Sequence, residues 1–138
     1  MSSPSGNEPT AAQPPLDALR RASEGLRYPS ESDEPFDVFC WPAQGAAAGS
    51  ASNAIAAHVA PDGARRAIEN VPVDQFFGDL NESDDAQRFR ELRQTLQFML
   101  KGLEVFRVGA GEVRVDVYLI GKADSGDWTG LHTVSIET

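Results

Sequence analysis

The chain has 138 residues, of which 41% are hydrophobic, and this is enough for one domain with a real core. Its formal net charge of −9 disfavours direct nucleic-acid binding, which normally rests on a basic face that neutralises phosphates. The same charge suits solubility and a protein partner with a basic surface. The single cysteine, Cys40, excludes an internal disulfide framework and any multi-cysteine zinc site.

The first 15 residues contain almost nothing that could be buried, so we expect a disordered tail before a domain that spans residues 16–138. The tail lacks the basic start and apolar run of a signal peptide, and no apolar stretch is long enough to cross a bilayer. Without an export signal, the expected compartment is the reducing cytoplasm.

The first predicted elements are a short helix and a strand. Residues 16–26 follow an amphipathic pattern, with Gly25 placed to end the helix. An acidic turn follows between Pro29 and Pro35, and the apolar run at 36–41 (FDVFCW) then predicts an inner strand that is buried on both faces.

The middle of the chain is less regular. Residues 42–52 are small and predict a loop, 55–59 could form a helical turn or a strand, and 61–63 (PDG) predicts a turn. The segment 71–77 should begin extended and continue as a short helix that Asp74 caps. This helix would carry inward the side chains of Phe76, Phe77 and Leu80.

The clearest helix is predicted over residues 83–102. Ser83 is a plausible N-cap and Gly102 a C-terminal stop. Apolar residues recur at helical spacing, which indicates a face packed on the core. These residues are Phe89, Leu92, Leu96, Met99 and Leu100.

The last third of the chain predicts β-structure. Strands are expected at 103–108, 112–120 and 128–138, with glycine-containing turns between them. In the last strand, Val134 and Ile136 should face one way, and Thr133, Ser135 and Glu137 the other. Helices followed by an antiparallel C-terminal β-meander give an α+β fold with a largely antiparallel sheet. Because the chain stops in strand register, we expect its terminal carboxylate near a sheet end.

No arrangement typical of a catalytic site stands out, and we expect no enzyme activity, cofactor or intrinsic metal site. Cys40 would be an inert thiol inside an aromatic strand, and a dyad of Cys40 with His132 is only a geometric possibility. His58 and His132 lack ligand-like spacing, and the acidic run at 79–85 lacks the ligand order of an EF-hand. Helix capping explains that run better.

Several stretches, in order along residues 16–138, resemble the nuclease A inhibitor family. The Ser-Glu-Ser turn before Pro-Phe and the Glu-Thr chain end are specific when they occur together. The matching segments are ASEGL (22–26), SES (30–32), PFDVF (35–39), VDQFF (73–77), VDVYLIG (115–121), GL (130–131) and ET (137–138).

The resemblance implies an α/β/α sandwich that forms a one-to-one complex with a sugar-nonspecific DNA/RNA endonuclease of the ββα-metal type. Members of the family occlude the magnesium-containing cleft of the nuclease. By this resemblance Glu31 occupies ground that substrate would use, and Thr138 approaches the metal region of the bound nuclease. Ser30, Ser32 and Asp33 complete the expected nuclease-binding turn.

Physical chemistry is consistent with these roles. A carboxylate such as that of Glu31 can mimic a phosphate, and the oxygens of Thr138 suit magnesium. The prolines that flank the turn reduce the entropy lost on docking, and the negative charge speeds encounter with a basic cleft. Asp33 and Glu34 would contribute mainly to this negative field.

One departure leaves alternatives open. The family has an aromatic residue in the loop after the paired phenylalanines, but residues 78–86 (GDLNESDDA) contain none. That contact patch is lost, moved to Trp128, or changed to suit another nuclease. A non-catalytic module of the same fold that binds a different basic partner is the main alternative function. A small hydrolase that uses Cys40 or a histidine is the third.

Overall fold

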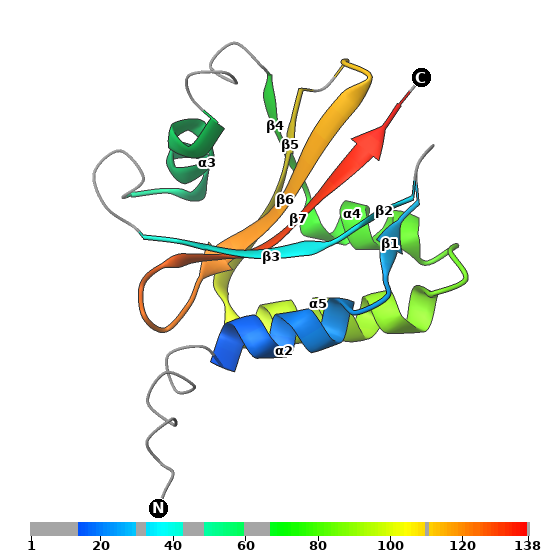
Figure 1. The fold of residues 1–138 in the computed structure, drawn as a ribbon, viewed down its shortest axis with the longest axis horizontal. Helices are drawn as coiled ribbons and strands as arrows, with labels where there is room; N and C mark the ends of the chain where they lie inside the picture. The colour runs from blue at the N-terminus through cyan, green and yellow to red at the C-terminus, as the bar shows by residue number, and fades with distance from the viewer. Residues whose placement is uncertain (1–13, 30–32, 43–48, 60–66, 110, 138) are drawn as a thin grey trace, which may run out of the picture.

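The computed structural model describes residues 14–29, 33–42, 49–59, 67–109 and 111–137, which form a mixed α+β fold (Figure 1). A five-stranded antiparallel sheet has helices on both faces, and a two-stranded hairpin lies beside it. The helices are α2 (Pro14–Ser23), α3 (Ala51–Val59), α4 (Val73–Leu80) and α5 (Ala86–Met99); the strands are β1 (Arg27–Tyr28), β2 (Glu34–Pro35), β3 (Asp37–Trp41), β4 (Ile68–Val71), β5 (Lys101–Val108), β6 (Arg114–Lys122) and β7 (Trp128–Ile136).

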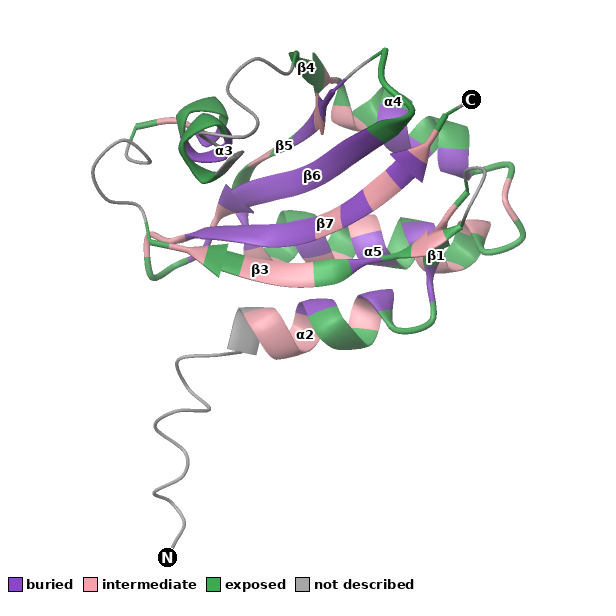
Figure 2. Cartoon of the chain, turned by 45° about the horizontal axis from the view of Figure 1, so that its top comes forward, coloured by how far each residue is buried: buried purple, intermediate pink, exposed green. Residues whose placement is uncertain are grey.

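The sheet order is β3-β7-β6-β5-β4, and every neighbouring pair is antiparallel. β5, β6 and β7 form the predicted C-terminal meander, so this part of the prediction is confirmed. β6 lies at the centre and is buried along nearly its whole length (Figure 2).

Helices α2, α4 and α5 cover one face of the sheet (Figure 1). The apolar stripe of α5 packs there as predicted, because Phe89, Leu92 and Leu96 are fully buried. They share a core with Leu119 of β6 and Leu131 of β7. Burial of this apolar surface is the main force that holds the layers together.

Helix α3 covers part of the opposite face and so makes the third layer (Figure 1). The segment that was ambiguous between helix and strand is therefore helical. Its apolar residues pack against β5, β6 and β7, in a cluster of Ala51, Ala54, Ile55, Phe106, Tyr118, Ile120 and Trp128.

The prediction of an inner strand at residues 36–41 is wrong, because β3 is an edge strand that pairs only with β7 among the described strands. Cys40 is exposed, so the prediction of a buried thiol is also wrong. The apolar run has another cause. Phe36 enters the core below the sheet, whereas Phe39 and Trp41 pack on the cluster around α3.

Three predicted helix ends also differ. Ser83 donates its hydroxyl hydrogen bond to the Leu80 carbonyl at 2.8 Å, so it closes the end of α4 rather than capping α5. The backbone is extended at Leu100, and Gly102, with φ of +65°, lies within β5 at a shift of register. Asp74 lies in the first turn of α4, and Pro72 occupies the N-cap position.

The first helix and the segments around it differ in part from the predicted boundaries. Helix α2 begins at Pro14, two residues before its predicted start, and most of the predicted tail lies outside the described residues. The turn predicted at 61–63 also lies outside them. Within the described ranges, no helix is long and apolar enough to cross a membrane.

Candidate functional site

Four of the five predicted site residues, Ser30, Glu31, Ser32 and Thr138, lie outside the described part of the chain. Asp33 is described. The structure also shows the two segments that lead into the others, which are the β1–β2 hairpin and the end of β7. These two segments form the frame of the candidate site.

The hairpin has a fixed register. Arg27 pairs with Pro35, and Tyr28 with Glu34. The Arg27 guanidinium donates a hydrogen bond to the Asp33 carbonyl at 3.2 Å across the hairpin. Asp33 has φ of +50°, in the left-handed region, which aspartate tolerates better than most residues. This residue therefore turns the chain back into β2.

The base of the hairpin rests on aromatic side chains. The Tyr28 ring stacks on Phe76 of α4, with ring centroids 5.6 Å apart and planes inclined by 1°. Its edge also contacts Phe36, which in turn meets Phe89 of α5. The acid-then-paired-phenylalanine segment thus has a defined role, because Phe76 supports the hairpin while Phe77 lies below the Arg93 guanidinium.

Strand β7 holds the hairpin from the other side. The Thr133 hydroxyl is within donating distance of two carbonyl oxygens of β2, that of Pro35 at 2.9 Å and that of Glu34 at 3.3 Å. Thr133 and Ser135 are buried, whereas Val134 is only partly so. The predicted alternation of faces is therefore right, but the polar face is the covered one. Sequence reasoning missed the role of Thr133.

The end of β7 is fixed at Glu137. Its backbone N–H donates to the Val113 carbonyl at 2.7 Å. Its carboxylate accepts hydrogen bonds from the Ser135 hydroxyl at 2.8 Å and from the Arg107 guanidinium. Arg107 also lies 3.9 Å from the Glu69 carboxylate. The sequence signal for Arg107 is a charge between the apolar residues Phe106 and Val108.

The hairpin and the end of β7 lie at the same end of the molecule (Figures 1 and 2). Burial raises the pKa of the Tyr28 hydroxyl, the charge of Arg107 opposes this shift, and the charges of Glu137 and Asp79 add to it. The hydrogen bonds from Thr133 of β7 to the Glu34 and Pro35 carbonyls of β2 place the two segments side by side. The chain segments that lead to Glu31 and to Thr138 therefore start from neighbouring points.

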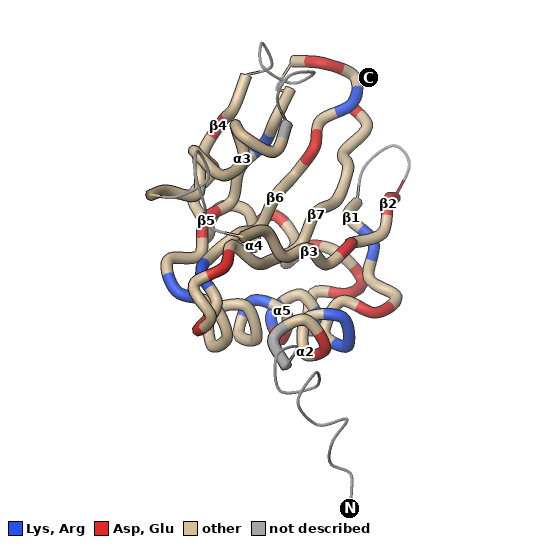
Figure 3. The backbone as a smooth tube through the Cα atoms, turned by 60° about the vertical axis from the view of Figure 1, so that its left-hand side comes forward, with Lys and Arg blue, Asp and Glu red and all other residues tan. Residues whose placement is uncertain are grey.

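The loop between α4 and α5 borders the hairpin. A groove of about 450 Å³ separates the two, lined by Arg27, Pro29 and Asp33 on one side and by residues 82–85 on the other. Figure 3 shows an acidic position where the chain enters β2. The loop lies beside the predicted site and carries carboxylates but no aromatic ring.

Trp128 cannot replace the missing aromatic contact. Its side chain is 6% exposed and packs in the cluster around α3. It starts β7, whereas Ile136 ends this strand, and eight residues at the usual strand rise span about 27 Å. Relocation of the contact patch to Trp128 is therefore wrong.

The residues considered for catalysis do not assemble. Cys40 pairs with Thr129, and His132 pairs with Asp37, three positions along β3. Because strand side chains alternate, Cys40 and His132 lie on opposite faces of the sheet, and the dyad is excluded.

The two histidines lie instead in one aromatic cluster. His132 hydrogen-bonds to Asp116 at 2.8 Å, and His58 stacks on Trp41 with centroids 4.0 Å apart. The Tyr118 ring lies between them, 4.8 Å from His132 and 6.4 Å from His58. Burial lowers the pKa of His58, and His132 lowers it further. Among the described residues, no group of three or more His, Cys, Asp or Glu could hold a metal ion.

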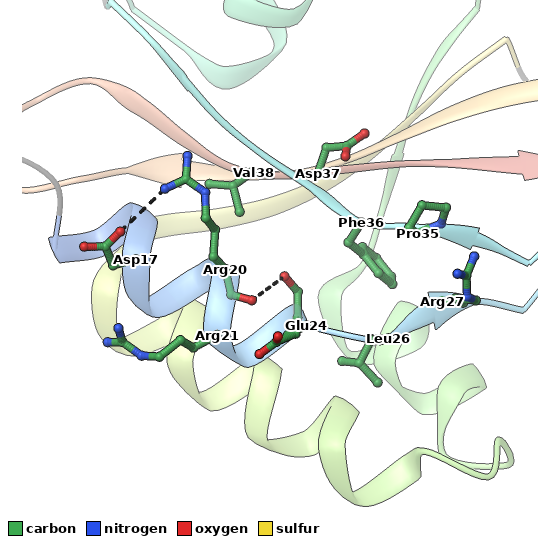
Figure 4. A pocket seen from close by; sticks show the side chains of 12 residues that line it. Asp17, Arg20, Arg21, Glu24, Leu26, Arg27, Pro35, Phe36, Asp37 and Val38 are labelled. Carbon is green, nitrogen blue, oxygen red and sulfur yellow. Dashed lines mark hydrogen bonds and ion pairs between the residues drawn. The ribbon is translucent and has the colours of Figure 1, made fainter.

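A second groove, of about 620 Å³, runs between α2 and β3 (Figure 4). Its walls carry charges of both signs, and Asp17 pairs with Arg20. The hydroxyl-bearing residue in the groove, Ser23, donates to the Leu19 carbonyl at 2.7 Å within the helix. This groove therefore lacks an activated nucleophile.

The family model of nuclease A inhibitor-like proteins matches residues 13–138. The chain belongs to this family. No curated protein sequence matches the chain. The match covers both halves of the candidate site in this nuclease A inhibitor-like protein, and it confirms the resemblance that the sequence motifs carried.

Proposed function

We propose that the protein is a nuclease inhibitor that forms a one-to-one complex with a sugar-nonspecific ββα-metal endonuclease and occludes its metal-containing active site. Membership of the nuclease A inhibitor-like family supports an inhibitory role. The observation that carries the proposal is the contact of the β1–β2 hairpin with β7, made by the hydrogen bonds of Thr133 to β2, together with the Arg107–Glu137 pair at the end of β7. This contact supports a joint approach of two segments, far apart in sequence, to one nuclease cleft.

In this proposal Glu31 acts as the phosphate mimic. A nuclease cleft offers cations, a metal ion and hydrogen-bond donors to phosphate oxygens, and a carboxylate can accept from all of them. Thr138 would bring a hydroxyl oxygen to the magnesium of the bound nuclease, because oxygen ligands suit this ion. Ser30, Ser32 and Asp33 would flank Glu31 at the interface, and this protein would supply no cofactor or metal of its own.

Two features of the described residues support this mode of binding. The hairpin stem is held by the Tyr28–Phe76 stack and by the hydroxyl of Thr133, so less entropy is lost when the tip docks. The adjoining loop at 82–85 adds carboxylates beside Pro29 and Asp33 of the hairpin, where they would face a basic cleft. The loop would then select a different nuclease from those that meet an aromatic residue at this position.

The test is a plasmid-degradation titration of a magnesium-dependent, sugar-nonspecific nuclease from the same cell, with light scattering of the mixture. The proposal predicts complete loss of cleavage at one equivalent and a one-to-one complex that buries about 1,600 Å². Such an inhibitor would act in the cytoplasm to protect the nucleic acids of its own cell.

A folded protein that neither binds nor inhibits this nuclease at large excess would refute the proposal. The loss of the loop aromatic would then favour an interaction module that binds another basic protein. Recovery of a non-nuclease partner in a one-to-one complex would support that second function.

A further inference from the structure

Arg107 is a largely covered charged residue that lies directly opposite Glu69 of the neighbouring strand β4. It lies in β5 next to the buried Phe106 and Val108, and its side chain is only 27% exposed. Its Nε atom is buried and has no hydrogen-bond partner among the described residues. A largely covered cation is costly unless carboxylates compensate its charge.

The carboxylate that compensates Arg107 most closely belongs to Glu137, the penultimate residue of the chain. Glu69 of β4 adds a more distant contact. Glu137 also accepts from Ser135 and donates its backbone N–H to Val113. The main chain of Glu137 is therefore held by Val113, just before β6. Its side chain is held by Arg107 of β5 and Ser135 of β7.

We propose that Arg107, together with Ser135, is a positioning residue that clamps Glu137 and so holds the backbone from which Thr138 continues. The clamp itself rests only on the contacts described here. Its consequence for inhibition rests on the proposed function, in which Thr138 reaches the metal region of the nuclease. A terminus held at the preceding residue loses less conformational entropy on docking than a free one.

The first test needs no nuclease. The full-length chain is labelled with ¹⁵N, and the heteronuclear NOE of the Glu137 and Thr138 amides is measured in the native protein. Arg107→Gln removes the charge and should lower both values. Ser135→Ala removes only the smaller donor and should lower them less, and it keeps the test valid if Arg107→Gln folds poorly.

Arg93→Gln is the matched control. Arg93 is also largely covered, with 30% side-chain exposure, and it also pairs with a carboxylate, that of Asp74. It has no contact with the chain end among the described residues. This variant should leave the NOE of Glu137 and Thr138 unchanged.

The second test is a double-mutant cycle on nuclease inhibition. Arg107→Gln should weaken inhibition by about 3- to 10-fold in the intact chain, and by much less once Thr138 is deleted. Unchanged NOE values in both Arg107→Gln and Ser135→Ala would overturn the clamp whatever the nuclease does. Lowered NOE values in a chain whose wild type inhibits no nuclease would support the clamp and refute the proposed function.

Discussion

Gly130 is the position in the sheet where the structure predicts the clearest loss of stability on substitution. It lies in the middle of β7, paired with Phe39 of β3 and Ile120 of β6. A Cβ atom placed there would lie 1.8 Å from the Leu119 carbonyl oxygen and 2.8 Å from its carbon. Because both are backbone atoms, no rotation of a side chain can relieve the contact.

The expected cost of Gly130→Ala follows from this contact. β6 and β7 would have to separate by more than about 1 Å to restore ordinary van der Waals distances. Loss of two ladder hydrogen bonds costs about 1 kcal/mol each, and the strain in the packing around Leu119 and Leu131 costs about 1–3 kcal/mol more. The free energy of unfolding should therefore fall by about 3–5 kcal/mol, a large share of the total for a domain of this size.

The assay is urea unfolding followed by tryptophan fluorescence and far-UV circular dichroism. Gly78→Ala is the matched control, because Gly78 lies in α4 and a Cβ there would meet nothing within 4 Å. It should raise the free energy of unfolding by about 0.5–1 kcal/mol, since alanine loses less backbone entropy than glycine. A Gly130→Ala protein within about 1 kcal/mol of wild type would refute the packing of β6 on β7 described here.

Three further predictions concern the frame of the site and the residues excluded from it. Phe76→Leu keeps an apolar group below the hairpin but removes the stack on Tyr28, so it should cost about 1 kcal/mol in a urea titration and lower the NOE of the Tyr28 amide; an unchanged NOE would contradict the supporting role. Burial and the neighbouring His132 lower the pKa of His58 in the folded protein below its ordinary value of 6.5. The stability that the neutral ring contributes is therefore fully present above pH 6.5, and it is lost as the pH falls through the lowered pKa of the folded state. The melting temperature of His58→Phe should therefore fall less than that of wild type between about pH 7 and about pH 5, and equal falls would count against this reading. Cys40 is exposed, so iodoacetamide should alkylate it in the native protein without loss of inhibition, and a loss would place it in the interface.

The parts of the fold that could be predicted are those set by local periodicity. The stripe of α5 and the inward side chains of α4 follow helical spacing, and β5, β6 and β7 are consecutive strands joined by short turns. The place of β3 could not be read in the same way. An apolar run of this length suits a strand between two strands, but it equally suits an edge strand whose apolar side chains pack partly on the cores of both faces.

In the candidate site too, local motifs can be identified from the sequence, whereas contacts between distant strands cannot. The motif residues Glu31 and Thr138 can be identified from the sequence, and they remain predictions because they lie outside the described residues. Arg107 and Thr133 could not be found, because their roles depend on pairing between strands that are distant in the chain. Nothing in the sequence around Arg107 indicates that its side chain will pair with Glu137, 30 residues later in the chain.

The most direct test of the account is the inhibition constant of Glu31→Gln against the target nuclease, with Glu24→Gln as the control. Both changes remove one negative charge without altering the size of the side chain, and Glu24 is an exposed residue in the turn after α2. If Glu31 is the phosphate mimic, Glu31→Gln should weaken inhibition at least about 10-fold, while Glu24→Gln should stay within about 2-fold of wild type. Equal inhibition by wild type and both variants would contradict the claim that the hairpin tip enters the active site.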